Sequence, residues 1–250
     1  MVIGNIFGEM ISKVSTSVAR KNLGVCQESS SQAFYTHVIS VFDTTYVDVA
    51  EVHSTFEEAA EFLLDLIRLA QIKLNLFFIF KPSKCDEFFV GRNQIWASPL
   101  KGKKIVDLRI ELSQLPNVLV LGDSSDPVEV IAAADVVITA CFSSTTADAL
   151  SAGKAAFWYE AGDNTRGYPA DRVKGLVAHG YDELETYLED ALMPGHWERI
   201  SEQRSLRKFT DPYLDGLALS RLRNSISSSG NSIMESFSPE YSEHVDPLES

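Results

Sequence analysis

Short runs of β-branched and aromatic residues alternate with helix-like stretches through the middle of the chain. Parallel strands need long connections, which a helix usually supplies, so this alternation is typical of a parallel sheet with crossover helices. It predicts an α/β fold of the doubly wound, Rossmann-like kind, a three-layer sandwich with about six parallel strands. We expect the strands at residues 37–42, 76–80, 118–121, 136–140, 155–159 and 175–178.

Signals for helix starts lie between these strands. Residues 54–57, Ser-Thr-Phe-Glu, form a capping box, and apolar residues then recur at helical spacing as far as Ala70. Residues 126–129 are the strongest start, because an N-cap Asp precedes a Pro at the first helical position and a Glu at the third. Other helices are expected near the end of the basic segment 92–109, from Ser144 to Gly153 and from Asp182 to Leu192.

We divide the chain into four segments. An N-terminal helical or linker segment spans 1–36, the Rossmann-like domain spans 37–193, and a C-terminal helical segment spans 194–226. The remaining tail, 227–250, is acidic and begins with a Ser-rich run, so it cannot bury enough apolar surface to become ordered. We expect the tail to be disordered and dispensable.

Composition restricts the partners and the compartment. The formal net charge is −13 and the pI is about 4.8, which argues against nucleic acid or an anionic membrane surface as a partner. Cys26, Cys85 and Cys141 lie far apart without metal-ligand spacing, which fits a reducing cytosol. The apolar runs are shorter than the ~20 residues that span a bilayer, and no signal peptide is recognised. We therefore expect a cytoplasmic chain without a transmembrane segment.

In an open parallel sheet, ligands bind beyond the carboxyl ends of the strands. The segments that converge there are residues 43–46, 81–84, 122–125 and 141–146. The last is the most informative, because free amides and the positive end of a helix dipole make such a turn an anion site, and its hydroxyls add donors. Alternatively, Ser144 or Thr145 only caps the helix and Asp148 closes a capping box. The other candidate residues at these strand ends are Asp43, Thr44, Lys81, Lys84, Gly122 and Asp123.

Several common catalytic motifs are absent from the sequence. There is no Gly-rich dinucleotide fingerprint, no GxxxxGK[ST] loop and no GxSxG nucleophile elbow, which disfavours NAD binding, ATP hydrolysis and covalent serine catalysis. The five histidines show no mutual spacing that suggests a dyad or a metal site.

Residues 130–138 followed by 142–154 resemble the donor-domain signature of GT-B glycosyltransferases. The run is especially similar to enzymes of surface-carbohydrate assembly, including polyol-phosphate transferases and the UDP-sugar 2-epimerases that share the fold. The resemblance extends roughly over 37–225, more loosely at 42–45, 80–82 and 215–221.

The resemblance implies a role for each residue of the turn. Ser143, Ser144 and Thr145, with Thr146 as a fourth hydroxyl, would hold the donor diphosphate, and Asp148 would hold the ribose, although family members more often have Glu there. No metal or cofactor is required, because the nucleotide sugar is itself a substrate.

Residues outside the turn have two interpretations each. Lys81, Lys84 and Arg166 could neutralise the diphosphate or be simply solvated, and the polar loop carrying Arg166 is of the kind that closes over ligands. Asp43 could be a base or metal ligand, or could satisfy a turn.

Three functions follow as hypotheses. The first is a glycosyltransferase donor domain that binds a nucleotide-activated sugar or polyol phosphate for surface polysaccharide synthesis. The second is a non-catalytic nucleotide-binding or scaffold half, and the third is a UDP-sugar 2-epimerase-like enzyme. In the family a first Rossmann-like domain supplies acceptor contacts, so the expected partners are an acceptor domain or subunit, and a homo-oligomer is left open. We expect this chain alone to bind a nucleotide without transferring sugar.

Overall fold

The computed structural model describes residues 4–25, 35–44, 46, 55–83, 104–140, 143–161, 173–194, 211, 213 and 215–236, the last nine by their backbone alone. Within these ranges six parallel strands form one sheet in the order β3-β2-β1-β4-β5-β6. This is the order of a doubly wound sheet whose direction reverses between β1 and β4. The predicted fold class and strand number are confirmed. The strands are β1 (His37–Phe42), β2 (Leu76–Lys81), β3 (Val118–Val120), β4 (Val136–Ala140), β5 (Ala155–Glu160) and β6 (Val177–His179).

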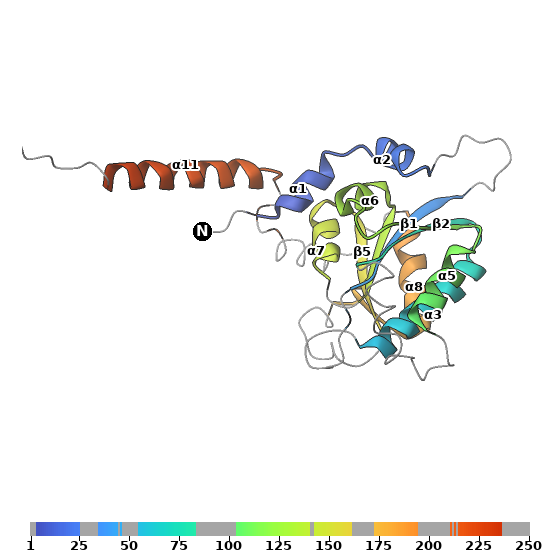
Figure 1. Cartoon of the computed structure of the whole chain (residues 1–250). Coiled ribbons are helices and arrows are strands. Elements are labelled where there is room, and N and C mark those ends of the chain that lie inside the picture. The colour runs from blue at the N-terminus through green and yellow to red at the C-terminus, as the bar shows by residue number, and fades with distance from the viewer. Residues whose placement is uncertain are drawn as a thin grey trace, which may run out of the picture.

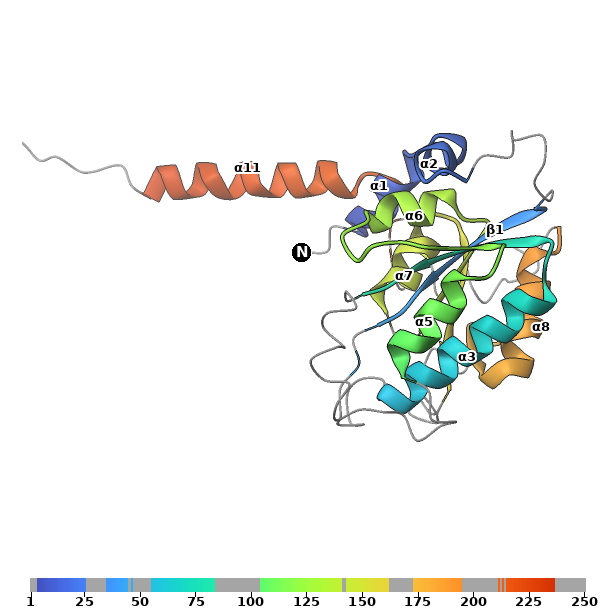
Figure 2. The ribbon, with the colours of Figure 1, turned by 45° about the vertical axis from the view of Figure 1, so that its right-hand side comes forward.

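Helices cover both faces of the sheet (Figures 1 and 2). On one face lie α3 (Phe56–Ile72), α5 (Ile105–Ser113) and α8 (Gly180–Leu192), and on the other lie α6 (Pro127–Ala133) and α7 (Ser144–Ser151). Successive side chains of a strand point to opposite faces, so both sets in β1 are buried: Ile39 and Val41 against the first layer, Val38 and Phe42 against the second.

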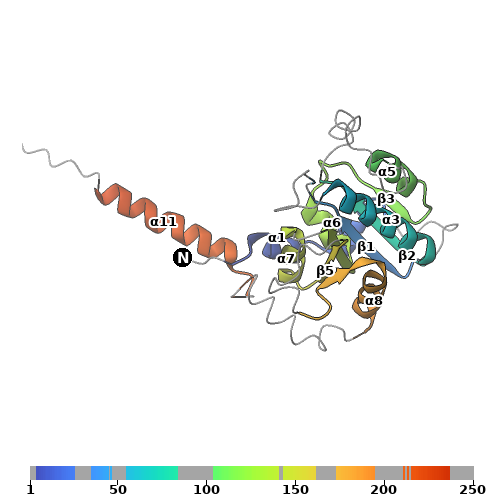
Figure 3. The ribbon, with the colours of Figure 1, turned by 90° about the horizontal axis from the view of Figure 1, so that it is seen from below.

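Two N-terminal helices are part of the folded body. α1 (Ile6–Ser12) and α2 (Thr16–Asn22) pack on the outside of α6 and α7, as Figure 3 shows for α1 and α7. Ile11 and Ala19 of these helices are buried in the same core cluster as β1 and β4. The segment predicted as helical or linker therefore forms an additional layer over one face of the sheet.

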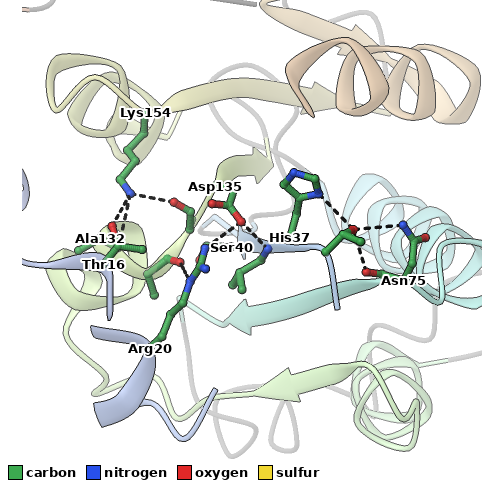
Figure 4. A network of polar contacts seen from close by, with 12 residues as sticks. Thr16, Arg20, His37, Ser40, Asn75, Ala132, Asp135 and Lys154 are labelled. Carbon is green, nitrogen blue, oxygen red and sulfur yellow. Dashed lines mark hydrogen bonds and ion pairs between the residues drawn. The ribbon is translucent and has the colours of Figure 1, made fainter. Parts of the chain in front are cut away.

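A polar network fastens α2 to the amino ends of the strands (Figure 4). The Lys154 ammonium donates to the carbonyl oxygens of Ala132 at 3.0 Å and Ala134 at 2.8 Å, and Arg20 Nε donates to that of Ala133 at 2.8 Å. The Arg20 guanidinium also pairs with Asp135 at 2.8 Å. Burial lowers the pKa of Lys154, whereas the charge of Asp135 raises it. The network satisfies the last carbonyls of α6 and lies at the edge of the sheet opposite to the predicted ligand site.

Gly8 lets α1 approach α7 closely. A Cβ atom added at Gly8 would lie 2.6 Å from the Cβ of Ser151, closer than real contacts allow. Only a residue without a side chain fits there, so the packing of the N-terminal layer depends on this glycine.

We predict that Gly8→Ala lowers the free energy of unfolding by about 1–2 kcal/mol, because overpacking of about 1–3 kcal/mol outweighs the helix propensity of about 1 kcal/mol that Ala adds. Urea unfolding followed by circular dichroism measures the difference. Gly122→Ala is the matched control, since its Cβ would meet only Ser124 Oγ at 3.8 Å. Equal stability of the two variants would contradict the proposed close packing.

Two boundaries differ from the sequence prediction. The N-cap of α3 is Thr55, whose hydroxyl accepts from the Glu58 amide while the Glu58 carboxylate accepts from the Thr55 amide, so the capping box lies one residue later than predicted. The last helix, α11 (Ala218–Ser236), projects from the body in Figure 1 and continues ten residues beyond the expected start of the tail at 227. The described backbone of residues 227–236 is thus helical, residues 237–250 lie outside the described part of the chain, and a dispensable tail stays a prediction.

Candidate functional site

The ends of β1, β2 and β3 are joined by polar contacts at the carboxyl edge of the sheet. The Ser83 amide donates to the Asp43 carboxylate, and the Ser83 hydroxyl donates to the Thr44 carbonyl at 2.6 Å. Lys81 Nζ donates to the Asp123 carbonyl at 3.0 Å. Three of the four segments that were predicted to converge are thus brought together, and β4, which supplies the fourth, pairs directly with β1.

The turn after β4 leads into α7 with Ser143 as its N-cap. The Ser143 hydroxyl accepts from the Thr145 amide at 3.3 Å and donates to Thr145 Oγ1 at 3.0 Å, and the Ser143 carbonyl accepts from Trp158 Nε1 at 3.0 Å. The prediction that Ser144 or Thr145 caps this helix is therefore wrong by one or two positions. Ser144 is left as an exposed first residue of α7.

The hydroxyl groups of α7 have different structural roles. Thr146 is fully buried, and its Oγ1 lies 2.6 Å from Oγ1 of Thr139 in β4, so it fastens the helix to the strand. Ser144 is exposed and Thr145 is half-buried. The first turn contains no acidic residue, and its first amides have no intrahelical acceptor. Ser144, Thr145 and these amides together form a donor-rich surface suited to an anion.

Asp148 does not close a capping box, because its carboxylate faces α1. Asp148 Oδ1 accepts from Asn5 Nδ2 at 2.9 Å. Burial raises the pKa of Asp148, and the hydrogen bond from Asn5 lowers it. Asp148 is half-buried and belongs to the second turn of α7, beside the donor-rich first turn.

Asp43 forms a buried ion pair with Arg109 of α5. The Arg109 guanidinium lies 2.7 Å from Asp43 Oδ2, and the two side chains are 3% and 1% exposed. Burial raises the pKa of Asp43, while the charge of Arg109 and the Ser83 amide lower it. With both carboxylate oxygens engaged, Asp43 holds the ends of β1 and β2 against α5, and the interpretation of Asp43 as an open base or metal ligand loses its support.

Lys81 is a buried cation at the same edge. Its ammonium donates to the carbonyl oxygens of Pro82 at 3.3 Å and Asp123 at 3.0 Å, and it has no carboxylate partner among the described residues. Gly122 and Asp123 are exposed beside it. Lys81 therefore leaves a positive charge near the ends of β2 and β3 that no protein carboxylate in the described ranges neutralises.

Sequence reasoning missed an acid and a histidine at the ends of β5 and β6. Glu160 and His179 are register partners, with His179 Nδ1 3.9 Å from Glu160 Oε2, and Glu160 is 4% exposed. Glu160 also lines a shallow hollow of about 240 Å³, solvent at its mouth included, together with Tyr46, Glu58, Phe62, Ala140, Tyr159 and Ala161. The predicted strands stopped one residue short of each. A polar residue directly after each of two neighbouring apolar runs was the signal that could have found the pair.

Some predicted site residues and site types are not placed by the structure. Lys84, Arg166, Cys141 and Phe142 lie outside the described residues. Within the described ranges, no three His, Cys, Asp or Glu side chains gather as a metal-binding group. None of the helices in these ranges is both long enough and apolar enough to span a bilayer.

Comparison with known protein families gives one match. A family model described as "Polysaccharide biosynthesis PFTS motif protein" matches residues 2–188. A search of curated protein sequences finds no match.

Comparison with solved structures finds the same fold at low identity. UDP-GlcNAc 2-epimerase from Neisseria meningitidis, bound to UDP-GlcNAc, is 16% identical with a TM-score of 0.53, over 91% of this chain and 55% of that one. The wall teichoic acid polymerase TagF is 14% identical with a TM-score of 0.51, over 89% and 48%. A glycosyltransferase from Rickettsia africae ESF-5 is 10% identical with a TM-score of 0.51, over 88% and 54%. The chain thus spans about half the length of these proteins, and the predicted resemblance to a GT-B half is confirmed at the level of the fold.

Proposed function

Because the chain belongs to the family of polysaccharide biosynthesis PFTS motif proteins, we propose that its sheet edge binds the donor of such a synthesis, a nucleotide-activated sugar or polyol phosphate. The observation that carries the proposal is the amino end of α7. It presents exposed Ser144, half-buried Thr145 and first-turn amides that lack an intrahelical backbone acceptor, of which that of Thr145 is capped by Ser143, where the order of the sheet reverses. The solved relative from Neisseria meningitidis with UDP-GlcNAc bound supports a nucleotide-sugar ligand for this fold.

Charge supports a diphosphate as the anchored group. The chain as a whole is strongly acidic, so an anion needs local compensation. The dipole of α7 supplies a partial positive charge, and the buried ammonium of Lys81 supplies a full one at the same edge of the sheet. These groups would stabilise the diphosphate as it becomes the leaving group, a contribution of several kcal/mol in comparable sites.

The acceptor and the catalytic base would come from elsewhere. The chain spans about half the length of each of these solved structures. We propose that an acceptor domain or subunit completes the cleft, and that the chain works in the cytoplasm, as its isolated cysteines suggest.

Specific observations support two alternatives to a glycosyltransferase donor domain. The engagement of Asp43 by Arg109 and Ser83 favours a non-catalytic binding module, in which the site holds a nucleotide without chemistry. The Glu160–His179 pair favours a UDP-sugar 2-epimerase-like enzyme, because it brings together the acid and the histidine that proton transfer at a sugar would need.

Binding and turnover assays on the full chain separate these functions. We expect the chain to bind one of UDP, CDP, GDP or CMP and its sugar or polyol derivatives, and not to transfer sugar by itself, because orientation of two substrates can account for ~7–11 kcal/mol of a barrier. Isothermal titration calorimetry and radiolabel transfer are the measurements. A flat response to the whole panel would overturn the donor-site proposal. Sugar transfer at ~1 per second by the purified chain would contradict the proposal that another domain or subunit completes the cleft. Interconversion of a UDP-sugar would establish the epimerase-like alternative.

A further inference from the structure

One asparagine connects α1 to α7 through the oxygen and the nitrogen of its side-chain amide. Asn5 Oδ1 accepts from the Gly8 amide at 2.8 Å and so caps α1, while Asn5 Nδ2 donates to Asp148 Oδ1 at 2.9 Å. The two residues are 143 positions apart in the sequence. Capping needs only the oxygen of this side chain, so the contact of its nitrogen with Asp148 is a second, separable function.

Asp148 is placed to meet a ligand on α7. It follows Ser144 by four residues and Thr145 by three, so the three side chains lie on the same side of α7. A carboxylate accepts hydrogen bonds and repels phosphate. Beside a bound diphosphate it therefore has to meet donors, and the nearest donors of a nucleoside diphosphate are the ribose hydroxyls.

Within the described part of the chain, no neighbouring charge takes over the role of Asn5. Among the elements packed against α7, α1 carries Glu9 and Lys13, which pair with each other, and β5 carries Glu160, which lies beside His179. α7 contains no other charged residue. The pKa of Asp148 is raised by burial and lowered by the hydrogen bond from Asn5.

We infer that Asn5 is a positioning residue for the donor: it orients the Asp148 carboxylate toward the ribose hydroxyls of the bound nucleotide. The inference rests on the proposed function, because it assumes that the diphosphate lies on α7. It assigns to the N-terminal layer, which forms no part of the sheet, a direct influence on which nucleotides bind.

Asn5→Ser tests the inference with the cap retained. A serine hydroxyl still accepts from the Gly8 amide but cannot donate to Asp148 at the position of Asn5 Nδ2. We expect Asn5→Ser to weaken binding of UDP or CDP, whichever the chain binds, by about fivefold, and to leave binding of its 2′,3′-dideoxy counterpart unchanged. Calorimetric titration of the full-length chain gives both affinities, and the ratio between them is the readout that a merely structural role would not move.

The pH dependence of binding gives a second readout. Without the Asn5 hydrogen bond the pKa of Asp148 rises further, so the variant should lose ribonucleotide affinity at a higher pH than the wild type does as the pH falls. An NMR titration of the Asp148 carboxyl carbon follows the same change without any nucleotide. If Asn5→Ser folds poorly, Asp148→Asn in the wild-type background should lose the same ribose preference.

The outcomes distinguish failure of this inference from failure of the proposed donor-binding function on which it rests. The inference is overturned, and the donor site is not, if the wild type binds a nucleotide but Asn5→Ser keeps the same ribose preference and loses affinity at the same pH as the wild type. Failure of the wild type to bind any nucleotide overturns the donor site, and the role of Asn5 falls with it. Collapse of the ribose preference with a raised Asp148 pKa supports both.

Discussion

Replacing Arg109 with methionine should lower the free energy of unfolding by about 3–5 kcal/mol, because it leaves the buried carboxylate of Asp43 without its partner. Asp43 and Arg109 are almost completely shielded from solvent, so water cannot solvate the carboxylate that loses its partner. The stem of methionine replaces most of the apolar contact of Arg109, including its position near the Phe80 ring. Urea unfolding at pH 7 measures the loss.

The pH dependence of this variant is part of the prediction. Burial already raises the pKa of Asp43, and removal of Arg109 raises it further. A folded state with a raised carboxyl pKa binds its proton more tightly than the unfolded chain, so stability is gained as the pH falls toward the ordinary Asp value near 4 and lost as it rises. The deficit of Arg109→Met should therefore be smaller at pH 4.5 than at pH 7.

A double variant separates the charge from the packing. In Asp43→Asn with Arg109→Met, the buried charge is gone and about half or more of the stability should return. If Arg109→Met alone is as stable as the wild type, or if its deficit does not change with pH, the ion pair does not hold the strand ends as described.

Replacing Ser144 with leucine should abolish binding of nucleoside diphosphate, a loss of at least a hundredfold, while leaving the melting temperature within a degree or two. Ser144 is exposed at the first position of α7, so leucine does not disturb the core but covers the amides that a phosphate would contact. Ser144→Ala should be milder, at about 1 kcal/mol for one hydrogen bond and somewhat more to a charged phosphate. Calorimetry with the nucleotide identified in the panel measures both.

Ser17→Leu is the matched control for this substitution. Ser17 is likewise an exposed serine in the first turn of a helix, α2, but it lies away from the carboxyl edge of the sheet. Full binding by Ser17→Leu and none by Ser144→Leu would locate the anion at α7. Normal diphosphate binding by Ser144→Leu would place the anion site elsewhere.

The strands were predictable because two-sided burial leaves a continuous apolar run. β1 and β4 begin and end at the expected residues, whereas β2 and β5 each continue by one, through Lys81 and Glu160. β6 was displaced: Gly175 adopts a φ of 85° in the preceding turn, and Gly180 ends the strand with a φ of 75°. An apolar run alone does not reveal these backbone angles, which any residue other than glycine would rarely adopt.

The contacts of the site were much less predictable than its location. The sheet rule places Asp43, Lys81 and Ser144 at the same edge, because parallel strands end on one side, and a ligand site at that edge stays a prediction. The partner of Asp43 lies 66 residues away on α5, and that of Asp148 lies 143 residues away on α1. No local pattern encodes such pairs, so a capping box was assigned to Asp148 where a contact between helices exists.

The docking of α1 on α7 also has a consequence for synthesis of the chain. Asn5 leaves the ribosome well before Asp148, and at about 5–20 residues per second the separation of 143 positions takes roughly 7–30 s to translate. During that interval the apolar side of α1, including Ile11, has no surface to pack on, because α6 and α7 are not yet made. A seven-residue helix is not stable by itself, so α1 folds only after the helices on which it packs have been translated. Until α6 and α7 are made, the apolar side of α1 thus remains open to chaperones, and its docking is a late step in the folding of this domain.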